Sequence, residues 1–154
     1  MSDLALRWGI EAADLVVEAN DLLLDGGLET AVILSLFTDR RADEADRLPD
    51  GHTDRRGWWG DAFPPEDGDR IGSRLWLLAR ETQQLSVLSR AETYATEALE
   101  WLRLDRVASR VAVHAEFSRP GWIVLQVVIE RPQVDPVEYR FNYIWAAQAA
   151  RVGT

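Results

Sequence analysis

The sequence contains no cysteine, which excludes disulfide bonds and thiolate metal sites. Its two histidines, His52 and His114, are far apart in the chain and stand in no spacing typical of a metal site. Each is best explained as an ordinary surface or strand histidine. We therefore expect no metal and no other cofactor.

Long hydrophobic runs are also missing. No apolar stretch approaches the roughly 20 residues of a membrane-spanning helix, and no basic segment precedes an apolar one at the N-terminus, as it would in a signal peptide. With 154 residues, of which 47% are hydrophobic, the composition is that of one globular domain over residues 1–154. We expect synthesis in the cytosol, no export and no membrane partner.

Lysine is absent as well, so all 17 cationic residues are arginine. The net charge of −9 argues against a general nucleic-acid binder. Residues 105–154 nevertheless hold five acids and six arginines, a net charge of +1, which suits this last third to an acidic partner. The arginine bias has two compatible explanations, a GC-rich genome and the planar bidentate pairs that arginine forms at interfaces.

The first half of the chain combines β-type runs with one apolar decamer. Residues 3–8 and 14–19 read as short strands, and a turn signal follows at Asn20-Asp21. The run 28–37 is nearly all apolar, which predicts a short buried helix, although a buried strand also fits. Residues 38–72 hold three prolines and five glycines and form a long irregular segment, whose aromatic residues argue against disorder.

Two helices are predicted after this loop. Ser73 is suited to cap a helix that begins at Arg74. Apolar residues at three- and four-residue steps then predict a longer amphipathic helix from about Gln83 to Leu104.

The final third alternates between apolar and polar residues. Residues 111–117 and 137–145 have the period of half-buried strands, whereas residues 122–130 are apolar on both faces, as in a central strand. Arg119-Pro120-Gly121 fits a tight turn between the first two. The expected fold class is α+β: a C-terminal three-stranded antiparallel meander packed against a long amphipathic helix, with short N-terminal strands and a long ordered loop rich in Arg, Asp and Trp.

One four-residue motif, Thr-Asp-Arg-Arg, occurs twice in the loop, which is too few copies for a repeat architecture. Because arginine holds carboxylates and main-chain carbonyls, the two copies either staple the loop to its own domain or bind another protein. Their charged residues are the candidate interaction residues: Asp39, Arg40, Arg41, Asp54, Arg55 and Arg56.

Trp58 and Trp59 lie between glycines and charges, where large apolar residues are unusual. Adjacent residues of an extended segment point in opposite directions. We therefore expect at least one ring to be buried beneath the loop and the other to serve as an interface anchor, since tryptophan is enriched at binding hot spots.

No arrangement of residues typical of catalysis is present. The sequence lacks a glycine-flanked catalytic serine and a phosphate-binding glycine loop. A carboxylate pair such as Asp54 and Asp61 would resemble that of a glycosidase, but neighbouring arginines would satisfy both acids structurally. We therefore predict a protein that is not an enzyme and has no catalytic residues.

Several stretches resemble, in this order, the Mu-like phage baseplate protein family. The likeness is close over about residues 28–108, and DRRGWWGD is long and unusual. The matching stretches are AVILSLFTDRRA (31–42), LPDG (48–51), DRRGWWGD (54–61), GSRLWLLAR (72–80) and EALEWL (97–102). The chain departs from the family at Arg106, where a glycine usually follows the aspartate, and it lacks the Glu-Pro-Arg motif of T-even-type relatives.

The resemblance implies a structural wedge subunit of a contractile tail. Such proteins are similar to the small wedge subunit of T-even phage baseplates, which carries a lysozyme-like label, so glycan hydrolysis is the alternative function. The expected place is the virion baseplate, after assembly in the bacterial cytoplasm. Six copies would contact the larger wedge proteins and the first ring of the tail sheath. An infectious phage, a prophage and a tail-like bacteriocin all fit.

The predicted strand 137–145 closes the sequence and leaves a sheet edge that no later strand covers. Because sheath proteins of contractile tails are linked by donated strands, the resemblance suggests that this edge exchanges a strand with the first sheath ring. The outward positions Asn142 and Ile144 are the candidate docking residues there.

Overall fold

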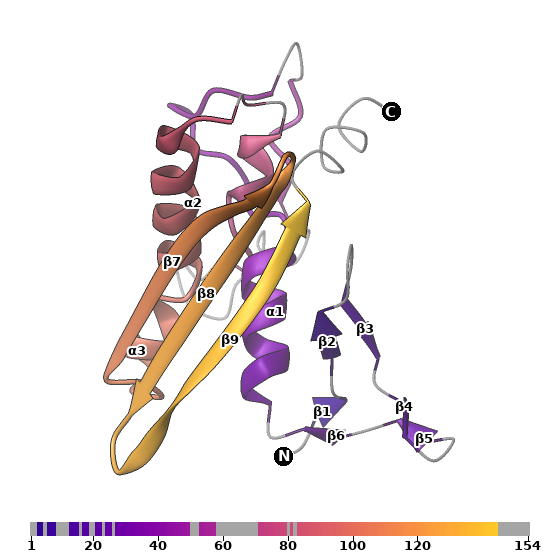
Figure 1. Ribbon diagram of the computed structural model, residues 1–154, viewed down its shortest axis with the longest axis vertical. Helices are drawn as coiled ribbons and strands as arrows, with labels where there is room; N and C mark the ends of the chain where they lie inside the picture. The colour runs from indigo at the N-terminus through magenta and orange to yellow at the C-terminus, as the bar shows by residue number, and fades with distance from the viewer. Residues whose placement is uncertain are drawn as a thin grey trace.

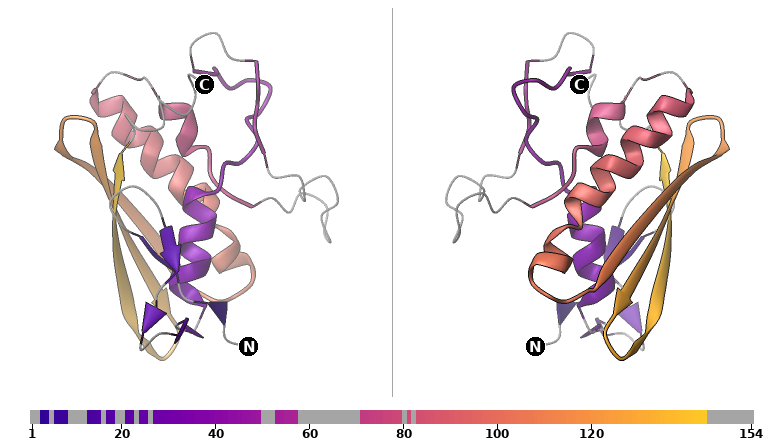
Figure 2. Two further views of the ribbon diagram at one scale, coloured as in Figure 1. Left: turned by 90° about the vertical axis from the view of Figure 1, so that its right-hand side faces the viewer. Right: turned by 90° about the vertical axis from the view of Figure 1, so that its left-hand side faces the viewer.

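The computed structural model describes residues 27–49, 53–57, 71–79, 81 and 83–144, and the backbone of six short strands between residues 3 and 25. The architecture is α+β, as expected. A three-stranded antiparallel sheet lies against helices α1 and α2 on one face (Figures 1 and 2). The elements of this body are α1 (Leu28–Phe37), the 3-10 helix η2 (Leu75–Leu78), α2 (Leu85–Ala98), α3 (Trp101–Leu104), β7 (Arg110–Arg119), β8 (Trp122–Arg131) and β9 (Val134–Ile144).

The sheet is the predicted meander, with strand order β7-β8-β9. The turn after Arg119 is confirmed, and Gly121 adopts a φ of 79°, which glycine reaches without strain. Strand β9 begins earlier than predicted and includes Pro136, a residue that sheets accept on an edge strand because it has no N–H to donate.

The core lies between the sheet and the helices. One face of β8 is almost completely buried, and each such apolar side chain contributes about 1.5–3 kcal/mol of transfer free energy. The residues of this face are Ile123, Leu125, Val127 and Ile129. Helix α2 packs on β7 with a stripe of small residues, Ala91, Ala95 and Ala98, which allow a close approach.

The predicted helix 83–104 is present but bent. Helix α2 ends at Ala98 and α3 begins at Trp101. At the bend the N–H of Leu102 bonds to the carbonyl of Leu99 at 3.1 Å, a tighter three-residue step. The indole N–H of Trp101 donates to the Ser35 hydroxyl at 3.0 Å and ties the bent part to α1.

The apolar decamer is a helix, α1, which resolves the helix-or-strand alternative. It contacts α2, β2 and β6, so apolar residues are needed all around it. At its end the ring of Phe37 packs against Phe141, with centroids 5.6 Å apart, and against Tyr143 at 6.0 Å. These contacts attach α1 to β9.

The N-terminal β-type runs form three small antiparallel pairs beside α1 (Figure 1). Strand β1 pairs with β6 and encloses two hairpins, β2-β3 and β4-β5. The strands are β1 (Asp3–Leu4), β2 (Leu6–Trp8), β3 (Ala13–Leu15), β4 (Val17–Glu18), β5 (Asp21–Leu22) and β6 (Leu24–Asp25). The expected strands are thus real but shorter than their runs.

The helix expected from Arg74 is only the single 3-10 turn η2. All four of its residues are buried, and a segment that is apolar on every side gives no amphipathic period from which to judge its length. Among the described residues, no helix is both long enough and apolar enough to cross a bilayer.

Arg106, at the departure from the family pattern, has a left-handed backbone with φ of 60°. The chain turns there, and the N–H of Ala108 bonds to the carbonyl of Leu102 at 2.9 Å. The helix end therefore has the conformation that favours glycine, although arginine occupies it.

We expect Arg106→Gly to raise the free energy of unfolding by about 1 kcal/mol, because glycine has no Cβ to oppose a positive φ. Urea denaturation measures the change. In the control Arg103→Gly, within α3, stability should fall by about 1 kcal/mol. A destabilised Arg106→Gly variant would contradict the left-handed turn.

Candidate interaction surface

The two copies of the Thr-Asp-Arg-Arg motif lie side by side. The N–H of Ala42 donates to the carbonyl of Arg55 at 2.9 Å. Asp39 of the first copy forms a salt bridge with Arg56 of the second. The Arg41 guanidinium also reaches the carbonyl of Arg56, at 3.4 Å. The repeat thus cross-links two segments of one loop, as the stapling hypothesis predicted.

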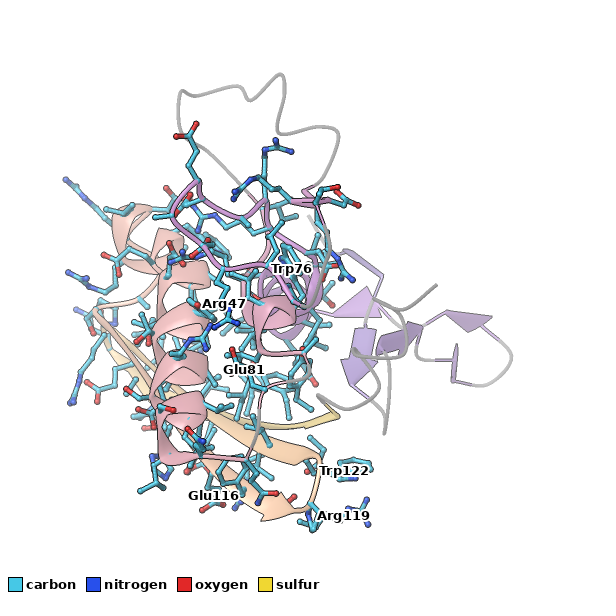
Figure 3. All side chains as sticks on the ribbon, turned by 90° about the horizontal axis from the view of Figure 1, so that it is seen from above. Arg47, Trp76, Glu81, Glu116, Arg119 and Trp122 are labelled. Carbon is cyan, nitrogen blue, oxygen red and sulfur yellow. The ribbon has the colours of Figure 1, made fainter. Side chains whose placement is uncertain are left out.

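Arg56 is held from three directions. Its backbone is left-handed, with φ of 54°, and its N–H donates to the carboxylate of Asp54 at 2.8 Å. Its guanidinium lies over the ring of Trp76, 4.7 Å from the centroid, in a cation–π contact. The indole N–H of this buried tryptophan (Figure 3) donates to the carbonyl of Arg40 at 2.8 Å. The motif is therefore anchored on a buried ring of η2.

A short parallel bridge joins the start of the loop to its end. The N–H of Ser73 donates to the carbonyl of Thr38 at 2.9 Å, and the N–H of Arg40 donates to the carbonyl of Ser73 at 3.0 Å. Gly72 has φ of 97°, and a Cβ there would lie 2.3 Å from the Thr38 carbonyl oxygen. Only glycine permits this approach. The Ser73 hydroxyl donates to the carbonyl of Leu36, so the bridge is also fixed to α1.

Arg74 is the centre of a larger ionic cluster, the Arg74 cluster. Its Nη1 lies 2.8 Å from the carboxylate of Asp46 and 3.3 Å from that of Asp43. Its Nε donates to Glu97 on α2 at 3.0 Å. The guanidinium also stacks over Tyr94, 4.8 Å from the ring centroid. One side chain thus joins the loop, η2 and α2.

The surroundings of Arg74 favour its charged form. Burial by itself lowers the pKa of a guanidinium, but hydrogen bonds to Asp46 and Glu97, together with their negative charge, outweigh it and raise the pKa of Arg74 above its ordinary value. A raised pKa keeps the stabilising charge at every pH below the ordinary pKa. The Arg74 side chain should therefore remain positively charged at any pH at which the protein folds.

Sequence reasoning missed this cluster because it treated Arg74 only as the first residue of a helix. The usable sequence signal was its position directly before four consecutive apolar residues. These four residues are all buried, and an arginine beside buried residues needs carboxylate partners for its charge. Nothing local points to Asp46 or Glu97, which lie 28 and 23 residues away in sequence.

The other predicted interaction residues lie either in the loop or on strand β9. Arg40 pairs with Glu97 at 3.7 Å, and Arg55 donates to the main-chain carbonyls of Asp43 and Glu44 rather than to a carboxylate. The loop therefore gathers all six charged motif residues.

Asn142 is exposed on β9, on the sheet face away from the helices. Ile144 is the last described residue of that strand, in register with Trp122. Trp58 and Trp59 lie outside the described residues, and so does Asp61. Within the described part of the chain, no three His, Asp or Glu residues form a group that could hold a metal ion, and none of its carboxylates is buried.

We expect Arg74→Met to lower the free energy of unfolding by about 2 kcal/mol, since it leaves the carboxylate of Asp46 without its cation and leaves Glu97 only the longer pair with Arg40. The matched control is Arg103→Met, which removes the exposed pair with Glu100 and should cost no more than about 0.5 kcal/mol. Equal urea midpoints for the two variants would show that the Arg74 cluster does not stabilise the fold.

Two known proteins and one family model match this chain over most of its length. The baseplate protein gp46 of Escherichia phage Mu is 45% identical over 142 residues, covering 92% of this chain and 96% of that protein. The Mu-like prophage FluMu protein gp46 of Haemophilus influenzae is 38% identical over 146 residues, covering 95% and 99%. The model of the family Phage protein GP46 matches residues 28–136, which span the loop, the helices and most of the meander. This chain belongs to the phage protein GP46 family.

Proposed function

We propose that this protein is a structural subunit of the baseplate of a contractile phage or phage-like tail, where it bridges the larger wedge proteins and the first sheath ring. The observation that carries the proposal is its similarity, over nearly the full length of both chains, to a Mu protein named as a baseplate protein. In this proposal residues 1–154 form one wedge-like domain, present in six copies in the virion tail.

The two edges of the sheet differ in a way that supports a role for β9. At β7, the carboxylate of Glu92 on α2 accepts the N–H of Ala115 at 2.9 Å and so satisfies that edge position. At β9, no further strand pairs on the second side within the described residues. Strand β9 is therefore the edge suited to accept a strand from a sheath subunit.

The register indicates which β9 groups face a docked strand. The N–H of Ala115 points away from β8, so its partner Leu125 directs its own N–H toward β9. Leu125 pairs with Phe141, whose N–H therefore points back to β8. Backbone groups alternate in direction along a strand. Glu138 and Arg140 lie three positions and one position before Phe141, so their N–H and C=O groups point to the open edge.

The loop supports the contact with the wedge proteins in a different way. The Asp39–Arg56 pair and the stack on Trp76 fix the described part of the loop up to Gly57, directly before Trp58 and Trp59. The motif arginines thereby hold the described chain that directly precedes Trp58 and Trp59, and we propose this pair as the anchor for a wedge protein.

We expect Arg140→Pro to abolish or shorten the sheath, because it removes an outward N–H without touching the ladder to β8. Arg140→Ala is the matched control, since it also loses the bond to Glu116 but keeps the N–H. Electron microscopy of tails gives the readout, and circular dichroism confirms the fold. Full-length sheaths with folded Arg140→Pro protein would exclude this edge and favour the Trp58-Trp59 segment.

The side chains at the same edge offer a second test. Arginine at both Asn142 and Ile144 should hinder a docked strand and reduce sheath assembly. Ala112→Arg, on the same face but two strands away, should leave assembly unchanged. Equal assembly by the double variant and by Ala112→Arg would mean that the docked segment does not pass beside Asn142 and Ile144.

We further expect no glycan hydrolysis, despite the lysozyme-like label of the T-even-type relatives. A general acid needs an apolar setting that raises its pKa, and the described carboxylates are all at least partly exposed. Purified protein should release no soluble product from peptidoglycan. Turnover that is lost on replacing one carboxylate would establish the enzymatic alternative instead.

A further inference from the structure

Trp122 differs from the other tryptophans whose side chains the structure describes. Trp76 and Trp101 donate their indole N–H groups to Arg40 and Ser35. Trp122 is partly exposed, and within the described part of the chain its indole N–H has no hydrogen-bond acceptor. An indole of this kind combines an apolar surface with an available donor, as at protein interfaces.

Arg119 stands directly on this indole. Its guanidinium lies 3.9 Å from the centroid of the Trp122 ring, and no described carboxylate pairs with it. The nearest acid in sequence, Glu116, is bonded to Arg140 at 3.3 Å. The stacking therefore orients the guanidinium, whose charge has no counterion among the described residues.

The pair lies on the sheet face away from the helices, at the turn between β7 and β8. Trp122 shares this face with Val124, Gln126 and Val128, while the alternate β8 residues enter the core. Figure 3 shows Arg119 and Trp122 beside each other at this end of the sheet, well away from Trp76 and the loop. The site is thus separate from the Arg74 cluster.

We propose that Arg119 and Trp122 form a docking site for an acidic segment of another protein of the tail, in which a carboxylate lies next to an apolar side chain. The indole N–H of Trp122 and the guanidinium of Arg119 are both hydrogen-bond donors, so the partner must supply acceptors. The positive charge of the guanidinium favours a negatively charged acceptor such as a carboxylate. Tryptophan and arginine are the residues most enriched at binding hot spots. The site belongs to residues 105–154, which carry a net charge of +1 in a chain whose total is −9.

This inference rests on the proposed baseplate role, because the partner is sought in the assembled tail. The direct test places the photo-crosslinker benzoylphenylalanine at Trp122, irradiates purified tails and identifies the attached peptide by mass spectrometry. The expected peptide comes from a different protein and has Asp or Glu beside an apolar residue. Arg119→Glu should lower the cross-linking yield about tenfold or more, whereas Arg110→Glu, at the far end of β7, should not change it.

Other outcomes overturn the proposal. These are no cross-link, a cross-link to another copy of this chain, a peptide without a carboxylate, or a yield that Arg119→Glu leaves unchanged. Quantifying this chain in the same tails separates the two hypotheses. Tails that contain the chain but give no cross-link reject only the docking site, whereas tails that lack the chain reject the baseplate role as well.

Discussion

The pairing of Arg74 with Asp46 and Glu97 is the interaction on which the arrangement of the loop depends. It connects the loop, η2 and α2, in addition to the buried apolar residues that η2 and α2 share. A single guanidinium can do this because its donors form a planar fork that reaches several acceptors at once. The loop thus gains order from ionic and main-chain bonds, where a helix or strand would use a backbone ladder.

The contacts that the arginines make explain how this protein uses arginine in place of lysine. Described arginines such as Arg56 and Arg74 are neutralised by carboxylates and stack on Trp76 and Tyr94, and they act within the fold. Arg119 stacks on a ring in the same way but has no described carboxylate partner. One type of contact therefore serves both internal cohesion and, in our proposal, recognition. Lysine would supply neither the fork nor the planar stack.

Features set by residues close together in the sequence were predictable, whereas features set by contacts between distant residues were not. Alternation over residues 111–117 reports directly on a half-buried strand, so the meander was predictable, and the turn at Gly121 with it. The bend after Ala98 and the brevity of η2 arise from tertiary packing, which periodicity does not report. The six motif charges were identified from the sequence, but the Arg74 cluster was not, because Arg74 meets Asp46 and Glu97 only after the chain has folded.

Strand β9 is an edge strand among the described residues, and we propose that it becomes paired in the tail. Amide hydrogen exchange, read by mass spectrometry with residue resolution, tests it most directly in isolated protein and in assembled tails. We expect the N–H of Arg140 to exchange fast in the isolated chain and slowly in tails, whereas the N–H of Phe141 should be protected in both. Fast exchange at Arg140 in assembled tails would contradict strand docking at this edge.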